Sequence, residues 1–253
     1  VQDLEAALAA PQRHRKHHSG QRPHTRPCVD PPLRCTAPPA VDRFQNSKDG
    51  QALLHSMEKK GIIGLGYLHN GMKQLSANKP LGSPADAKGL KFRIQQSDVL
   101  EAQFKAVGAN PQKLAFSEVY QALQTGVVDG QENTWSNIYS KKFYEVQDYI
   151  MESNHGLVDY MVIVNAKWWN GLPADIRKGL SEAMTGAVKF GNDAAFNEAA
   201  SFREKVIAAH KAKVLPMNKV HLDAWRAAMQ PVWKQFEGEI GADLIQAAQK
   251  ANR

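Results

Sequence analysis

The stretch KGLKFRIQQSDVLEAQFKAVGANPQKLAFSEVYQALQTGVVDGQENTWSNI, residues 88–138, decides the fold that this sequence predicts. Apolar and basic residues alternate over residues 90–93, which is the period of a short strand. Ser97 then offers a helix N-cap, and Gly108 ends the helical pattern that follows. A second strand and helix end at Gly126. Alternating strands and helices predict βαβ units, and therefore an α/β fold with a largely parallel sheet covered by helices.

Three side chains in this stretch are placed where such a sheet binds ligands. In open α/β sheets the ligand crevice lies beyond the carboxyl ends of the strands. Arg93 stands at a strand end, Phe116 directly before a helix, and Asn133 in the loop after a strand. We therefore expect these three residues near one crevice.

Four segments, in one order along the chain, resemble a known family. GLKFRIQ, GANP, AFSEVYQALQTGVVDGQEN and KKFYEVQ are similar to the signature of the solute-binding proteins of TRAP transporters, the DctP-like, C4-dicarboxylate-binding family. The resemblance begins near residue 48 and continues to Arg253. It implies a two-domain periplasmic-binding-protein-like fold with a long helix that spans both domains.

The same resemblance implies a function. Members bind small organic acids between two α/β domains in the periplasm and pass them to membrane permease subunits. They need no cofactor, are usually monomers and are not enzymes. We find no Gly-rich phosphate loop, no H-E-x-x-H and no G-x-S-x-G that would indicate an enzyme on this fold.

The resemblance also assigns roles to four residues, and a fifth departs from the family's pattern. Arg93 is expected to anchor a ligand carboxylate, because a guanidinium offers a charged pair of donors in one plane. Lys73 would hold a second carboxylate, and Asn133 would hydrogen-bond the ligand and the anchor arginine. Phe116 would pack against the ligand's carbon skeleton. Thr134-Trp135 departs from the Asn-Pro pair that is commoner in the family, and a tryptophan there would narrow or shape the pocket, which favours a small dicarboxylate over a sugar acid.

Each assignment has an ordinary alternative that the residues alone leave open. Arg93 could be an exposed strand arginine, Lys73 a wet surface lysine, and Phe116 a core phenylalanine. Glu132 would repel an anion, so we expect it to pair with a basic neighbour or to face away. His155 has no nucleophile motif beside it, and we expect a structural or pocket-lining role.

The resemblance predicts domain boundaries along the chain. We expect residues 48–68 and 159–200 to form what remains of an N-terminally truncated first domain. The second domain would comprise residues 69–158 and 211–253, and a helix over 173–210 would connect the two. Within these, the glycines at residues 61–71 indicate a strand, a turn and a second strand, and the apolar run 160–164 indicates a buried strand of a parallel sheet. Two helices, 222–236 with core tryptophans and 240–251, would close the chain.

Residues 1–47 are rich in proline, arginine and histidine, and we expect them to be disordered. Residues 1–44 lie outside the resemblance; a mis-called gene start explains them better than a signal peptide, whose order of regions is wrong. The interleaved prolines and the lack of aromatic residues argue against a basic arm for nucleic acid or membrane. The histidines and the two cysteines here lack the spacing of a zinc site, so we expect no metal (His14, His17, His18, His24, Cys28 and Cys35).

The amino-acid composition excludes few classes of function. The chain has 253 residues, 43% of them hydrophobic, which suffices for a buried core. The net charge of +7 suits an acidic partner without choosing one. Two functions therefore stay open: a carboxylate-binding protein of TRAP type, and an altered remnant in which Arg93 lies on an open half-cleft.

Overall fold

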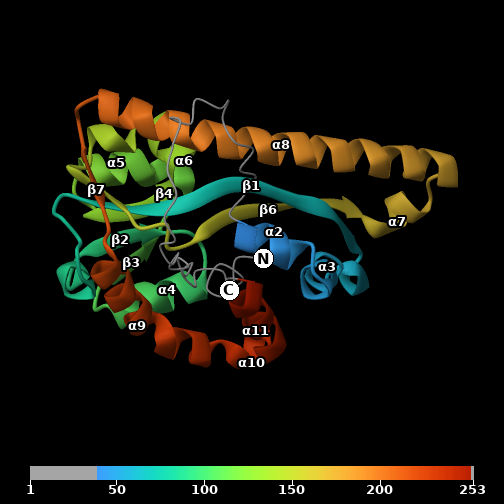
Figure 1. Ribbon diagram of the computed structural model, residues 1–253, viewed down its shortest axis with the longest axis horizontal. Helices are drawn as coiled ribbons and strands as arrows, with labels where there is room; N and C mark the ends of the chain where they lie inside the picture. The colour runs from blue at the N-terminus through green and yellow to red at the C-terminus, as the bar shows by residue number, and fades with distance from the viewer. Residues whose placement is uncertain (1–38, 252–253) are drawn as a thin grey trace, which may run out of the picture.

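The computed structural model describes residues 39–251 of the chain. Helices pack on both faces of a sheet, and one long helix lies along the whole molecule (Figure 1). The strands are β1 (Ile62–Ala77), β2 (Lys91–Ile94), β3 (Asn110–Lys113), β4 (Gly130–Thr134), β5 (Tyr149–Glu152), β6 (Leu157–Asn165) and β7 (Lys213–Pro216).

The α-helices differ greatly in length. They are α2 (Pro39–Gln45), α3 (Lys48–Leu54), α4 (Asp98–Ala106), α5 (Val119–Gln124), α6 (Trp135–Ser140), α7 (Ala166–Asn170), α8 (Ala174–Ala208), α9 (Lys219–Gln235), α10 (Glu237–Ile240) and α11 (Ala242–Ala251). Short 3₁₀ turns cover Glu58–Lys60, Pro84–Ala87, Phe116–Glu118 and Phe143–Glu145.

The βαβ prediction for residues 88–138 is confirmed, but the sheet as a whole is mixed. The strand order is β3-β2-β4-β1-β5-β7, with β6 pairing another part of β1. β2 runs parallel to β3 and to β4, and β5 runs parallel to β7. β1 is antiparallel to β4, β5 and β6. The expectation of a largely parallel sheet is therefore wrong, because the central strand runs against its neighbours.

The predicted turn near Gly71 is also wrong, because β1 is one continuous strand of 16 residues. Gly71 has a φ of 142° and sits at a register shift in the pairing with β6. The glycine supports a bulge, which bends the strand without ending it. The predicted domain boundary between residues 68 and 69 thus falls inside one strand.

β6 differs from its prediction as well. It pairs antiparallel with the first part of β1, and Tyr160 and Ile163 are 50% and 49% exposed. The expected parallel strand buried on both faces is therefore not found.

Residues 39–47 are ordered, which corrects the prediction of disorder for that part of the segment. Val41 and Phe44 of α2 are buried against Ile245 and Ala248 of α11. Arg43 donates from Nε to the carbonyl of Ala251 at 2.9 Å. The first and last helices of the described chain, α2 and α11, therefore pack against each other (Figure 1). The disorder predicted for residues 1–38 lies outside the described residues.

Two separate cores lie on the two faces of the main sheet. On one face, Phe92 of β2 stacks on Phe104 of α4 with ring centroids 4.7 Å apart, and α9 covers the cluster with Trp225 and Met229. On the other face, residues of α5, α6 and α8 pack together, including Trp135 and Val206.

The long helix is predicted well. α8 covers Ala174–Ala208, against the expected 173–210, and Pro173 occupies the N-cap position. His210 has a φ of 51°, which ends the helical path. In Figure 1, α8 runs over β1 and extends to α7 at the far end of the molecule.

Candidate functional site

Arg93 projects from β2 toward the face covered by α5, α6 and α8. Its neighbours Phe92 and Ile94 belong to the core on the opposite face, so strand alternation places Arg93 away from them. The side chain is only 4% exposed, so it is not the exposed strand arginine of the alternative interpretation.

The guanidinium of Arg93 is fixed by one backbone carbonyl. Nε and Nη2 donate to the oxygen of Leu114 at 3.0 and 2.9 Å. Within residues 39–251 its Nη1 makes no hydrogen bond. Burial lowers the pKa of Arg93 below its ordinary value, while the charge of Glu132 opposes that shift. The group stays cationic, since an arginine pKa lies far above neutrality.

Phe116 lies close to two cations. It is 37% exposed and meets the buried ring of Phe143 edge-to-face, with centroids 6.0 Å apart. The Arg93 Cζ is 5.9 Å from the Phe116 ring centroid, and the Nζ of Lys141 is 5.4 Å from it. The structure thus brings Arg93 and Phe116 together, as predicted. Lys141 was missed, although it opens the KKFYEVQ segment.

Asn133 shares the sheet face of Arg93 without contacting it. In the β-ladder, Gln131 pairs with Arg93, and Asn133 stands two residues further along the same strand. Its Oδ1 accepts from the Asn137 Nδ2 at 2.6 Å and from the Thr134 amide at 3.1 Å. The expected bond between Asn133 and Arg93 is not made, since Arg93 donates to Leu114 instead.

Trp135 begins α6 and is buried in the core of that face. It also lines a cavity of about 170 Å³ beneath α8, together with Asn70, Thr134 and Phe196. Arg93, Phe116 and Asn133 are not among the residues around this cavity. Of the five predicted residues, Trp135 alone lines this cavity.

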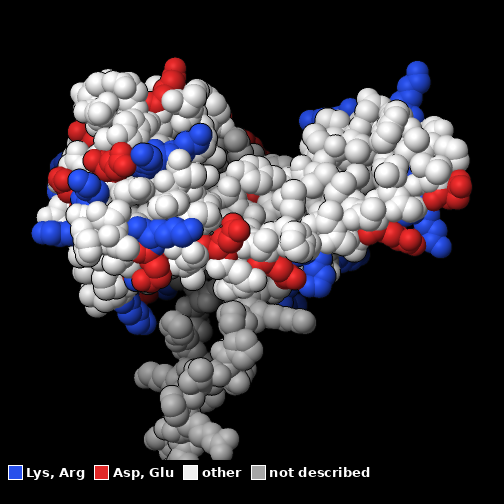
Figure 2. Space-filling model, turned by 90° about the horizontal axis from the view of Figure 1, so that it is seen from above, with Lys and Arg blue, Asp and Glu red and all other residues white. Residues whose placement is uncertain are grey.

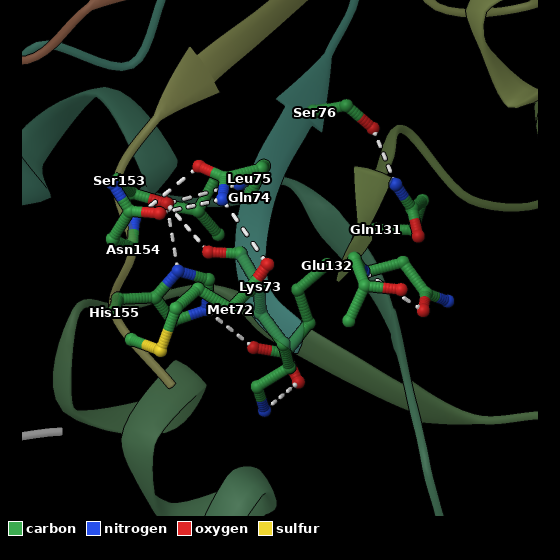
Figure 3. A network of polar contacts seen from close by, with 12 residues as sticks. Met72, Lys73, Gln74, Leu75, Ser76, Gln131, Glu132, Ser153, Asn154 and His155 are labelled. Atoms are coloured by element: carbon green, nitrogen blue, oxygen red, sulfur yellow. Dashed lines mark hydrogen bonds and ion pairs between the residues drawn. The ribbon is translucent and has the colours of Figure 1, made fainter. Parts of the chain in front are cut away.

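Lys73 lies on the other face of the sheet, in a buried polar network (Figure 3). Its Nζ donates to the Glu132 Oε1 at 2.7 Å, and the His155 Nε2 lies 2.6 Å from the Glu132 Oε2. The His155 Nδ1 lies 2.7 Å from the Ser153 Oγ. The prediction that Glu132 pairs with a basic neighbour is confirmed, and His155 belongs to the same buried network.

The charge of Glu132 is set by this network. Burial alone raises its pKa, but the positive charge of Lys73 and the contacts with His155 outweigh burial and hold the pKa at about 2. Glu132 is therefore ionised at neutral pH. A ligand can bind Lys73 only if the ammonium group also stays paired with Glu132 or gives up that pairing.

Within residues 39–251, no group of three or more His, Cys, Asp or Glu residues is arranged to hold a metal ion. The His and Cys residues weighed at the N-terminus lie outside that range. None of the helices in the described part of the chain has the length and apolar character that crossing a membrane requires.

Comparison with known proteins identifies the family. The sequence profile of bacterial extracellular solute-binding protein family 7 (DctP) matches residues 24–239. The chain belongs to this family. The match reaches further toward the N-terminus than residue 48, where the quoted motifs begin.

Similar members of the family are C4-dicarboxylate-binding proteins by name. The chain is 54% identical over 213 residues to the periplasmic protein DctP of Shewanella loihica and 51% identical over 214 residues to DctP of Vibrio cholerae. These alignments cover 84% and 85% of this chain, but only 63% and 64% of the two relatives. The chain thus spans less than two thirds of the length of either relative.

Solved structures of the family confirm the fold. A TRAP periplasmic solute-binding protein from Shewanella oneidensis with bound succinate has a TM-score of 0.82 and 52% identity, over 85% of this chain and 70% of that one. One from Pseudomonas aeruginosa with bound L-malate has a TM-score of 0.73 and 43% identity, over 79% of this chain and 71% of that one. The predicted two-domain, periplasmic-binding-protein-like α/β fold with a long helix is confirmed.

Proposed function

We propose that this chain binds a C4-dicarboxylate as the solute-binding component of a TRAP transporter, with Arg93 as the carboxylate anchor. The observation that carries the proposal is the geometry of Arg93. A backbone carbonyl holds two of its donor atoms, Nη1 makes no bond within the described residues, and an aromatic ring lies beside it. The similar protein from Shewanella oneidensis was solved with succinate bound.

The remaining roles follow from the positions of the side chains. The half-exposed ring of Phe116 would contact the carbon chain of the ligand, and Lys141 beside it adds a second positive charge. Asn133 would donate from Nδ2, since its Oδ1 is already engaged. Trp135 would limit the size of the pocket. Lys73 would take part by sharing its ammonium group between Glu132 and the ligand.

The proposal extends to location, partners and domains. A solute-binding protein of this type would act as a monomer in the periplasm and deliver its acid to membrane permease subunits without chemical change. The two domains would be those that the sequence predicts, with α8 connecting them and the ligand between them. The boundary near residue 68 would then be a bend within β1.

Isothermal titration calorimetry tests the proposal directly. The full chain is titrated with succinate, with L-malate and with a sugar acid, and then the Arg93→Ala, Arg93→Lys and Lys91→Ala variants are titrated. Lys91 is the matched control, because it lies on the same strand and is exposed. We expect the dicarboxylates to bind best and Arg93→Ala to lose roughly 100-fold in affinity, since truncating one side of a buried charged pair costs about 2–5 kcal/mol.

Two outcomes would count against the proposal. Equal binding by the wild type and the Arg93→Ala variant would remove Arg93 from the anchor role. No heat with any acid would favour the second candidate, a chain that keeps the family's motifs without effective ligand binding.

A further inference from the structure

The side-chain amide of Asn133 is held in one orientation by its neighbours. Its Oδ1 accepts from the Thr134 backbone amide at 3.1 Å and from the Asn137 Nδ2 at 2.6 Å. A backbone N–H can only donate, so the Asn133 atom that faces Thr134 must be the oxygen of the amide and not its nitrogen. The nitrogen therefore lies on the other side of the amide group, away from these two contacts.

This orientation makes Asn133 a hydrogen-bond donor toward its surroundings. A carbonyl oxygen has two lone pairs, and two donors already occupy them at Oδ1. The Nδ2 makes no hydrogen bond within residues 39–251. Asn133 is 5% exposed, and its Nδ2 is not among the buried unpaired atoms of the described chain, so solvent reaches it. A ligand that contacts Asn133 there meets N–H groups and no acceptor.

Asn137 is placed to control this orientation. It lies in the first turn of α6, where its own backbone amide donates to the Thr134 Oγ1 at 3.4 Å. Its side chain makes the shorter of the two bonds to Asn133. Lys141, four residues further along, ends α6 and holds its Nζ 5.4 Å from the Phe116 ring centroid. Because residues four apart share one side of a helix, the side of α6 that carries Asn137 adjoins two groups of the proposed ligand site.

We propose that Asn137 is a positioning residue that favours carboxylate ligands by keeping the donors of Asn133 turned toward the ligand. This role depends on the proposed function, because it requires a ligand at Arg93. Without the Asn137 N–H group, the Asn133 amide keeps only one weaker contact and can turn over. Its oxygen would then face the ligand and repel a carboxylate, so binding of the acid should weaken.

Isothermal titration calorimetry of the full chain with succinate tests this role. Asn137→Leu keeps the approximate shape of the side chain and removes its N–H groups. The matched control is Ser136→Ala, because Ser136 lies beside Asn137 on α6 but donates to the Asn70 Oδ1 at 2.9 Å. We expect Asn137→Leu to weaken succinate binding about tenfold, the effect of losing one hydrogen bond to a charged group. Ser136→Ala should bind succinate as the wild type does.

A second pair of titrations asks whether Asn137 acts through Asn133. The Asn133→Ala variant is compared with the double variant Asn133→Ala with Asn137→Leu. The added Asn137→Leu change should not weaken binding further, since the amide that Asn137 orients is already gone. If Asn137 only supported the packing of α6, its replacement would weaken binding equally with and without the Asn133 side chain.

The outcomes separate the two proposals. No binding of succinate by the wild type would overturn the proposed function, and the role of Asn137 with it. Binding by Asn137→Leu as tight as that of the wild type would overturn the role of Asn137 alone, and so would an equal loss in both backgrounds. If Asn133→Ala binds too weakly to titrate, Asn137→Leu and Ser136→Ala are compared at equal stability in urea, and equal affinities overturn the role. If Asn137→Leu does not fold, Asn137→Ala replaces it in every comparison.

Discussion

At the scale of single residues, Glu132 is the group on which the buried network depends. Both of its carboxylate oxygens are occupied, one by Lys73 and one by His155. Replacing Glu132 by Gln removes the charge and leaves the Lys73 ammonium buried without its counter-ion. Breaking a buried ion pair in this way costs about 3–5 kcal/mol.

We predict that Glu132→Gln lowers the free energy of unfolding by that amount, measured by urea denaturation at pH 7. The matched control is Glu182→Gln, because Glu182 forms an exposed pair with Lys178 at 3.9 Å. Exposed pairs contribute about 0–1 kcal/mol, so the control should unfold almost as the wild type does. Equal midpoints for the two variants would contradict the assigned importance of the network.

Because the pKa of Glu132 is lowered in the folded chain, we predict that the stability of the chain depends on pH. The pKa of Glu132 is about 2 in the folded chain against an ordinary value of 4.5, despite the opposing effect of burial. A lowered pKa gives stability that is complete above pH 4.5 and is lost as the pH falls toward 2. The lost amount is on the order of 3 kcal/mol.

The measurement compares unfolding free energies of the wild type and Glu132→Gln between pH 6 and pH 2. The difference between the two proteins should shrink as the pH falls through this range. Glu101, whose pKa is also about 2 because of Lys105 and Lys113, is present in both proteins and cancels. A difference that stays constant with pH would show that folding does not lower the pKa of Glu132.

At the scale of elements, the contact between β4 and its two neighbours requires Gly130. It pairs with Ala77 on β1 and with Phe92 on β2. A Cβ at this position would stand 2.5 Å from the Ser76 carbonyl oxygen and 2.6 Å from the Phe92 ring. Backbone on one side and a packed ring on the other leave it no space.

We predict that Gly130→Ala destabilises the chain by about 1–3 kcal/mol or more, the usual cost of overpacking a core. Gly179→Ala is the matched control, since Gly179 lies within α8 with nothing within 4 Å of an added Cβ. Alanine should stabilise that helix by about 0.5–1 kcal/mol. Chemical denaturation of both variants measures the change in the free energy of unfolding, which should fall for Gly130→Ala and rise for Gly179→Ala. A change of the same sign in both variants would refute the steric argument.

The elements that sequence predicted correctly are those whose signals are local. Ser97 caps α4, and Gly108 and Gly126 take positive φ values directly after α4 and α5, as their positions indicated. Gly71 was misjudged, because a glycine in a bulge and a glycine in a turn look alike in sequence. At Gly71, β1 pairs with Val158 of β6, far along the chain, and continues as a strand.

The site was predictable to a similar extent. Arg93 and Phe116 come from one local unit, and they do lie together. Lys73 and Glu132 are 59 residues apart in the chain. The sequence therefore indicated that Glu132 needs a basic partner, but it could not identify that partner as Lys73. The folding of α2 rests on α11 at the other end of the chain, which no local pattern reveals.

At the scale of the whole molecule, net charge explains little of the expected attraction for an acid. The chain carries +7, yet Figure 2 shows basic and acidic side chains mixed over the face seen from above, where α8 lies. Binding energy should therefore come from the local contacts of Arg93 rather than from a general field. A ligand that binds the folded chain through such contacts must stabilise the whole fold.

We predict that succinate at a hundredfold excess over its dissociation constant adds about 2.7 kcal/mol to the stability of the wild type. For a chain of this size that corresponds to a rise of about 5–11 °C in Tm. Thermal melts followed by circular dichroism check this, with butane-1,4-diol and sodium chloride of equal ionic strength as controls for chain length and charge. The rise should vanish in Arg93→Ala and persist in Lys91→Ala. A rise with sodium chloride equal to that with succinate would mean that screening of the net charge, and not a site at Arg93, stabilises the chain.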